Sequence, residues 1–163
     1  MHATAAVKHA LMSSGDMVPM YLADLSDADL LVRPVPNANH IAWQLGHLIN
    51  SEKQMLTPML AGVAYPELPK ALVDNDKKQT SRQDPPVGYL GKNEYLDLFK
   101  KVRSATAAAV EKLSDADLDK PSTVMKDFAP TLGALLILTA NHTLMHAGQF
   151  TVVRRKLGKP VLF

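Results

Sequence analysis

Two histidines near the C-terminus, His142 and His146, are four residues apart. Four residues are close to one helical turn, so both imidazoles lie on the same face of a helix. Such a pair can supply two ligands to one metal ion, although the same spacing also arises by chance. Around a helix the pair shares its arc with a mostly apolar set, namely Leu135, Leu138, Thr139, Gln149, Phe150 and Val153. The pattern therefore predicts that both histidines face the core.

The spacing alone leaves open which groups bind these two imidazoles. Buried ring nitrogens need hydrogen bonds, which core hydroxyls or the backbone could supply, or they can share a metal ion. His47 favours the metal, because it lies at the edge of the apolar arc of a second predicted helix. Three imidazoles with open coordination positions are typical of a catalytic metal site. We expect His40 to be exposed, and His2 and His9 to be ordinary surface residues.

Two other residues are candidates for a catalytic role. Glu52 projects from the middle of the apolar arc that flanks His47, and a buried carboxylate needs a partner. It could pair with an arginine such as Arg103, hydrogen-bond a ligand histidine, or bind the metal directly. Gln149 could orient a bound group through its amide. No residue is an evident general base, so the catalytic residues are otherwise unknown.

Composition limits the classes of function. The 163 residues suit one domain, 1–163, with a sizeable core. The net charge is +2, and acidic residues are interleaved with basic ones, which argues against nucleic acid as a partner. Without cysteine, any metal must be held by nitrogen and oxygen donors. No signal peptide and no apolar run of roughly 20 residues is found, which predicts a cytoplasmic protein without a membrane span.

Hydrophobic periodicity predicts four helices. They cover residues 3–24, with a bend or break at Gly15 and Pro19, a stretch from Asn37 or Asn39 to about Met59, residues 93–113, and residues 131–157. The six residues Leu-Ser-Asp-Ala-Asp-Leu occur at 25–30 and again at 113–118, dividing the chain into two helical hairpins. An all-α four-helix bundle follows, because no stretch shows strand alternation.

The segment 60–91 is rich in proline and polar residues and has no helical pattern. A connection of this length lets the second and third helices run parallel, which predicts an up-down-down-up bundle. The segment could be a simple crossover or a lid over a substrate, because loops this long are usually functional or mobile.

The motifs Asn39-His40-Ile41-Ala42-Trp43-Gln44-Leu45-Gly46-His47-Leu48 with Glu52, and His142-x-x-x-His146-Ala147-Gly148-Gln149, resemble the DinB-like family of small bacterial proteins. The resemblance covers essentially the whole chain. It implies a four-helix bundle with parallel second and third helices. It also implies a divalent metal, nickel or zinc, held by His47, His142 and His146. Homodimers are common in the family, so the resemblance implies a homodimer here.

Proteins of this family include thiol S-transferases that use bacillithiol and a mycothiol-dependent maleylpyruvate isomerase. The resemblance therefore implies a metal-dependent enzyme, a thiol S-transferase or a hydrolase-like one, acting on a low-molecular-weight thiol or a small electrophile. The alternative is a non-enzymatic, stress-associated metal-binding or interaction domain. A cavity of ligand size at the metal would favour the enzyme, and a closed fourth position would favour a structural role.

Overall fold

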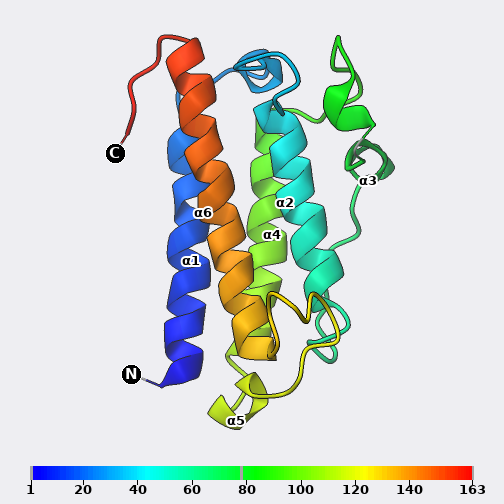
Figure 1. Cartoon of the computed structure of the whole chain (residues 1–163), viewed down its shortest axis with the longest axis vertical. Helices are drawn as coiled ribbons and strands as arrows, with labels where there is room; N and C mark the ends of the chain where they lie inside the picture. The colour runs from blue at the N-terminus through cyan, green and yellow to red at the C-terminus, as the bar shows by residue number, and fades with distance from the viewer. Residues whose placement is uncertain (1, 78, 163) are drawn as a thin grey trace.

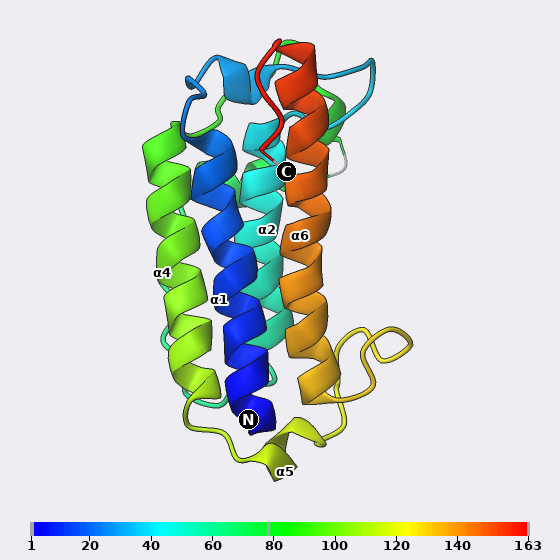
Figure 2. The same ribbon diagram turned by 90° about the vertical axis from the view of Figure 1, so that its left-hand side faces the viewer.

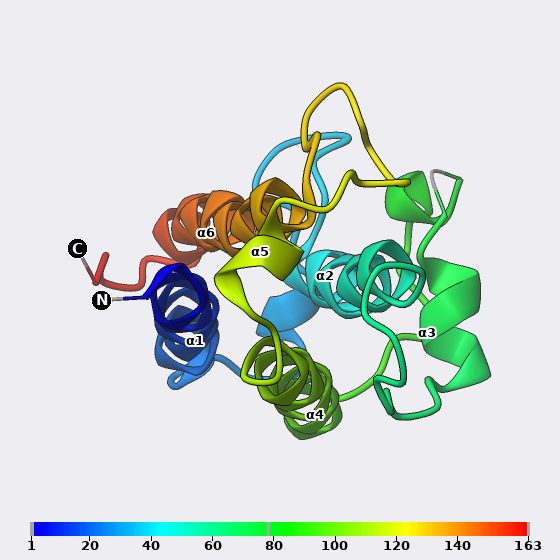
Figure 3. The same cartoon turned by 90° about the horizontal axis from the view of Figure 1, so that it is seen from below.

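Four long helices build the protein, and the computed structural model describes residues 2–77 and 79–162 of it. They are α1 (Ala3–Leu22), α2 (Ile41–Leu56), α4 (Lys92–Val110) and α6 (Leu132–Lys156), which lie side by side (Figure 1). Helix α1 contacts α4 and α6, and α2 contacts the same two helices. The four helices therefore surround a common core, as the view along the bundle shows (Figure 3).

The order of the helices produces the predicted topology. In Figure 1, α1 and α6 run upward, whereas α2 and α4 run downward. The view from the side of α1 and α4 shows the same directions (Figure 2). The prediction of an all-α, up-down-down-up bundle with parallel second and third long helices is confirmed. None of the described helices is both long and apolar enough to cross a membrane.

The crossover between α2 and α4 is more ordered than the sequence pattern indicated. It contains the short helix α3 (Lys70–Asn75) and the 3-10 helix η2 (Thr80–Arg82). Helix α3 lies on the outer side of α2 (Figure 3). This packing brings the residues that follow α3 close to the middle of α2.

The repeated six-residue segments form two matching turns. The first leads into the 3-10 helix η1 (Asp29–Leu31) and supplies its first two residues, and the second forms the short helix α5 (Asp115–Leu118). In each turn the serine hydroxyl accepts a hydrogen bond from the backbone N–H three residues later, at 3.2 Å for Ser26 and 3.3 Å for Ser114. The aspartates at those positions accept the serine backbone N–H in return, both at 2.8 Å. Such reciprocal caps explain why the same sequence occurs at both ends of the bundle.

The first helix is not broken at the two residues where the sequence predicted a bend or break, because α1 is continuous through Gly15 and Pro19. Pro19 cannot donate a hydrogen bond to the carbonyl of Gly15, four residues earlier. Gly15 is buried against α4, where an added Cβ would come within 3.5–3.6 Å of Arg103 and Phe99. The close packing of α1 on its neighbours compensates for the missing hydrogen bond.

The start of α2 also differs from the prediction. The N-cap is His40, and neither Asn37 nor Asn39 fills this position. The Nδ1 atom of His40 accepts a hydrogen bond of 3.1 Å from the backbone N–H of Trp43. His40 is therefore buried, with 0% of its surface exposed, and the expectation that it lies on the surface is wrong. At this N-cap an imidazole nitrogen, in place of the usual side-chain oxygen, accepts the hydrogen bond. The sequence pattern therefore did not indicate that His40 caps the helix.

Burial of His40 predicts a loss of stability at mildly acidic pH. Burial first, and the positive charge of Arg33 second, lower the pKa of His40 from 6.5 to about 4. Between these two pH values the unfolded chain binds a proton that the folded protein does not bind. Stability is therefore lost as the pH falls from 6.5 to about 4, by on the order of 3 kcal/mol for this group.

The measurement is urea unfolding of metal-free protein across this pH window, for the natural chain and for His40→Asn. Asparagine can still cap the helix but does not titrate, so the variant should show a shallower pH dependence. The other buried histidines contribute equally to the pH dependence of stability in both proteins. Identical pH slopes for the two proteins would show that His40 does not remain neutral in the folded state.

Candidate metal centre

Helices α2 and α6 bring together the three histidines that the sequence singled out. His47 comes from α2, and His142 and His146 come from α6. One ring nitrogen from each lies within 4.8 Å of the other two. The ring centroids are 4.8 Å apart for His142 and His146, and 5.0 and 5.4 Å from His47 to these two. This is the group of metal-ligating side chains found in the described part of the chain.

Gln44 fixes the orientation of His146. The Gln44 side-chain nitrogen donates to the carbonyl oxygen of Asn39 at 2.9 Å, which turns its Oε1 atom towards the histidine. Because this oxygen can only accept, the Nδ1 atom of His146 carries the proton and donates at 2.9 Å. The Nε2 atom of His146 then carries the lone pair, as metal binding requires, and it faces the Nε2 atom of His142 at hydrogen-bond distance, 3.2 Å.

Asp76 fixes the orientation of His47. One carboxylate oxygen of Asp76 accepts the Nδ1 proton of His47 at 2.9 Å, and the other accepts a hydrogen bond from Asn50 at 2.8 Å. The Nε2 atom of His47 is then available to a metal. A carboxylate behind a ligand histidine is the usual outer support of such sites. Asp76 follows α3, so the crossover segment contributes directly to the site.

The spacing of the two helix α6 nitrogens fits a metal ion. The Nε2 atoms of His142 and His146 are 3.2 Å apart. Two imidazoles that bind one ion at about 2.0–2.1 Å with tetrahedral angles have their nitrogens roughly 3.3 Å apart. The pair on α6 thus has the spacing of two ligands of one ion, and imidazole donors suit a borderline divalent cation such as zinc or nickel.

Burial keeps two of the imidazoles neutral. It lowers the pKa of His142 to about 4, with a smaller contribution from the neighbouring His47. It lowers the pKa of His146 to about 3, with smaller contributions from His142 and His47. Neutral imidazoles offer the lone pairs that a cation needs, so both side chains are in the protonation state of ligands at neutral pH.

Trp43 covers the outer side of His47. Its indole ring stacks on the imidazole with centroids 4.9 Å apart and an angle of 11° between the planes. The stacking and the hydrogen bond that His47 donates to Asp76 together restrict the rotation of the His47 ring.

Glu52 and Gln149 lie away from this cluster of ring nitrogens. The Glu52 carboxylate is buried and accepts hydrogen bonds from Arg103 at 3.0 and 3.1 Å and from Thr106 at 2.7 Å. The sequence left three partners open for Glu52: an arginine, a ligand histidine and the metal. The structure pairs Glu52 with the arginine, Arg103. Gln149 is exposed on α6. His2 and His9 are exposed as expected.

Two supports of the site, Gln44 and Asp76, were not predicted. Gln44 is three residues before His47, and this spacing on a helix could have indicated that the two share a side. Asp76 had no such signal, because it is 29 residues from its partner and meets it only through the packing of α3 on α2.

Two cavities reach the metal centre from different sides of His47. The first, here called the polar cavity, has a volume of about 470 Å³ and is lined by Asn37, Asn39, Trp43, His47, Asp76, Ser81 and Arg82. The second, the apolar cavity, has about 280 Å³ and is lined by His47, Ser51, Gln54, Met55, Met125, Leu138 and His142. Both are large enough for small molecules, and each borders at least one of the three histidines.

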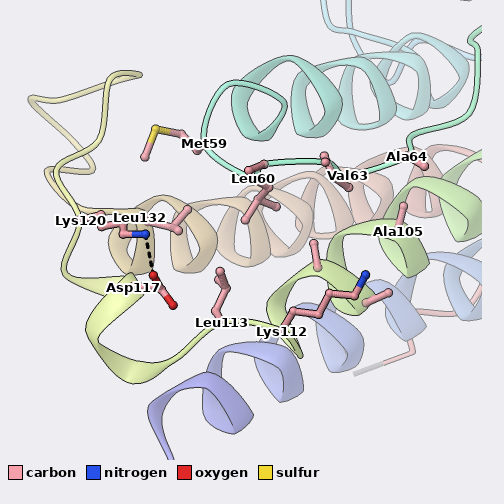
Figure 4. Close-up of a pocket in the computed structure, with 14 residues that line it drawn as sticks. Met59, Leu60, Val63, Ala64, Ala105, Lys112, Leu113, Asp117, Lys120 and Leu132 are labelled. Carbon is pink, nitrogen blue, oxygen red and sulfur yellow. Dashed lines mark ion pairs between the residues drawn. The ribbon is translucent and has the colours of Figure 1, made fainter.

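A larger cavity, of about 510 Å³, lies between the end of α4, the start of α6 and the residues that follow α2. Met59, Leu60, Leu113 and Leu132 line it, with Lys120 in an ion pair with Asp117 at 2.6 Å (Figure 4). It contains none of the three clustered histidines, so it is separate from the metal centre.

Loss of Asp76 is predicted to weaken metal binding. In Asp76→Ala the Nδ1 proton of His47 loses its acceptor, and the ring is free to rotate. Removing such an outer partner typically lowers metal affinity by about 10- to 100-fold. Competition with a chromophoric chelator measures this change. Asp74→Ala, which removes an exposed ion pair with Lys70 on α3, is the matched control and should retain full affinity.

Comparisons with known proteins show which family and which solved structures this chain resembles. The sequence model of the DinB superfamily matches residues 10–150. A solved structure of a conserved protein from Enterococcus faecalis is 16% identical with a TM-score of 0.72, and covers 98% of this chain and 99% of its own. A DinB-like protein from Bacillus cereus is 19% identical with a TM-score of 0.66, and covers 92% of this chain and 91% of its own.

None of the curated proteins matches the chain. The two structural neighbours share the fold, and the family match covers most of the sequence, including all three clustered histidines. The chain belongs to the DinB superfamily.

Proposed function

We propose that this protein is a divalent-metal-dependent enzyme that transfers a low-molecular-weight thiol to a small electrophile. One observation carries the proposal: two cavities of small-molecule size border the histidine cluster, one at His47 and the other at His47 and His142. A structural metal site needs a closed fourth position, whereas a catalytic site keeps one open. The cavities therefore favour the enzyme over the alternative, a non-enzymatic metal-binding or interaction domain.

The residues of the site would have distinct roles. His47, His142 and His146 would hold the cation, while Asp76 and Gln44 keep two of these rings in the required orientation. When bound, a divalent cation such as zinc or nickel lowers the pKa of a thiol or a water, which makes a nucleophile near neutral pH. Both oxygens of Glu52 are engaged by Arg103 and Thr106, so the proposal assigns no proton transfer to Glu52.

A homodimer is part of the proposal. Helix α6 exposes apolar side chains on the side facing away from the bundle, namely Ile137, Leu144, Met145 and Val152. Gly148 lies among them, and a Cβ built there meets no atom within 4 Å, so its own chain does not require a glycine. A second copy crossing closely at Gly148 would explain both features, because a glycine allows two helices to approach.

The test is a measurement of metal content combined with a thiol-transfer assay over several cellular thiols. We expect about one equivalent of divalent metal per chain, and activity that a chelator removes and the metal restores. Protein purified from metal-replete cells without any bound metal would refute the proposal. Metal binding without transfer to any of the electrophiles would support the non-enzymatic alternative.

A further inference from the structure

The cavity of about 510 Å³ between the end of α4, the start of α6 and the residues after α2 has no part in the proposed function. It is here called the α4–α6 cavity, and Figure 4 shows the side chains that line it. Pockets that bind small molecules have volumes of roughly 300–1,000 Å³. The α4–α6 cavity therefore has the size of a binding site for a small molecule.

Small residues on two walls leave this space open. On α4 the wall consists of Ala105, Ala108 and Ala109, which share one face because they are three and four residues apart. On the wall that follows α2, Gly62 has a φ of +70°, and a Cβ built on it meets no atom within 4 Å. Gly62 and Ala108 are exposed, so the cavity opens to solvent.

The inner surface of the cavity is aliphatic. Leu60 after α2 and Leu132 at the start of α6 are only 2% and 1% exposed, and Leu113 is half-buried in the same cluster. In Figure 4 the side chains of Leu60 and Leu113 point towards one another. Aromatic side chains are absent from the described lining. An aliphatic chain placed against these leucines would remove apolar surface from water, which favours binding.

One of the two lysines of the cavity has no acidic partner. Lys120 forms an ion pair with Asp117 at 2.6 Å, and the other oxygen of Asp117 accepts the backbone N–H and the hydroxyl of Ser114 at 2.8 and 2.7 Å. Lys112 is exposed and forms no ion pair with the rest of the described chain. Two lysines and one aspartate leave the lining with an excess of positive charge, which favours an anion.

The uncommitted charge and the aliphatic surface are close enough for one molecule to contact both. Lys112 and Leu113 are consecutive residues, and both line the cavity. In Figure 4 the Lys112 side chain extends from the turn after α4 back towards Ala105. The ammonium group of lysine is a compact point charge, which matches a single carboxylate without the two parallel hydrogen bonds that a guanidinium provides.

We infer that the α4–α6 cavity binds an aliphatic carboxylate, with its chain against Leu60, Leu113 and Leu132 and its carboxylate at Lys112. The inference does not rest on the proposed function, because this binding needs neither a metal ion nor the clustered histidines. It gives the bundle a second ligand site, separate from the metal centre.

Isothermal titration calorimetry of metal-free protein with octanoate tests the inference. We expect a saturable heat with about one site per chain. Burial of one methylene lowers a Kd by about fourfold, so decanoate, with two more methylenes, should bind roughly 10- to 20-fold more tightly. Acetate has the charge without the chain and should give no saturable heat. The alcohol 1-octanol has the chain without the charge and should bind about three- to tenfold more weakly than octanoate.

A charge variant tests the role of Lys112. Lys112→Met should raise the Kd for octanoate by about three- to tenfold and leave the Kd for 1-octanol unchanged, because only the contact with the carboxylate is lost. Lys156→Met is the matched control, since Lys156 is an exposed lysine at the end of α6 that does not line the cavity. It should leave both Kd values unchanged.

A filling variant tests the place of the chain. Ala105→Leu extends a side chain into the cavity from α4 and should abolish the saturable heat with octanoate. Ala108→Leu, at an exposed position of the same wall, is the second filling variant. Leucine has a high helix propensity, so circular dichroism should show that both variants are folded. The control is Ala5→Leu, at an exposed position of α1 outside the cavity, which should bind octanoate normally.

The outcomes separate this inference from the proposed function. The same octanoate Kd in His142→Ala and the natural chain would support a site apart from the metal centre, and loss of binding in this variant would overturn the inference. An unchanged octanoate Kd in Lys112→Met or in Ala105→Leu would also overturn it, as would the absence of a saturable heat with decanoate. Absence of thiol transfer in a protein that binds octanoate as predicted would refute the proposed function alone.

Discussion

His142→Ala is expected to reduce bound divalent metal from about one equivalent per chain to a trace after dialysis. The Nε2 atoms of His142 and His146 are 3.2 Å apart, and the group of possible ligands found in the described part of the chain contains only His47 besides these two. Removing even an outer partner of a ligand lowers metal affinity by about 10- to 100-fold. Removing a direct ligand should therefore lower it by at least about a hundredfold. Plasma emission spectrometry and chelator competition measure the content and the affinity.

His9→Ala is the matched control for this experiment. His9 is exposed on α1 and belongs to no cluster of ligands, so its loss should leave metal content unchanged. Circular dichroism of both variants checks that the bundle is folded. Equal metal content in His142→Ala and the natural protein would place the metal elsewhere.

Arg103→Met is expected to lower the free energy of unfolding by about 3–5 kcal/mol. The guanidinium is buried and pairs with Glu52 at 2.9 Å. It also donates to the backbone carbonyl of Leu11 and to the hydroxyls of Ser14 at 3.1 Å and Thr143 at 2.8 Å. Without Arg103, the Glu52 carboxylate would be buried without its cation. Urea unfolding at neutral pH measures the loss.

The control is the double variant Glu52→Met with Arg103→Met. It removes both charges, so no uncompensated carboxylate remains, and an apolar pair of similar size is often tolerated. Its stability should lie clearly above that of Arg103→Met alone. A double variant that is as unstable as the sum of the two single variants would show that Glu52 and Arg103 do not act as a pair.

The same ion pair connects the fold to the metal centre. Glu52 follows His47 by five residues on α2, and Thr143 is next to His142 on α6. Arg103 on α4 bonds both of them and α1 as well. One guanidinium therefore ties together the two helices that supply the histidines. Its bonds hold α2 and α6 in a fixed relative position, which a site built from both helices requires.

Local sequence patterns were sufficient to predict most of the helical framework. The periodicity of apolar residues marks the long helices, and the repeated Leu-Ser-Asp-Ala-Asp-Leu segment marks two of their turns. The length of the crossover was enough to predict parallel α2 and α4. His142 and His146 were recognisable as a pair because they are one turn apart on the same helix.

Features that depend on tertiary contacts could not be predicted in this way. His40 is buried because its ring nitrogen caps α2 and its ring meets the edge of Tyr89, with centroids 4.4 Å apart. Asp76 supports His47 only because a short helix within the crossover packs on α2. The contacts of His40 with Tyr89 and of His47 with Asp76 leave no spacing pattern in the sequence, because each joins segments that are far apart in the chain.

X-ray absorption spectroscopy of nickel-loaded protein, with and without a small thiol such as 2-mercaptoethanol, tests whether three imidazoles hold the ion and leave room for a thiol. The predicted spectrum has three imidazole ligands with lighter donors completing the shell, and addition of the thiol brings one sulfur to roughly 2.3 Å, as for a zinc–thiolate bond. Fewer than three imidazoles, or a shell that the thiol does not change, would contradict the claim.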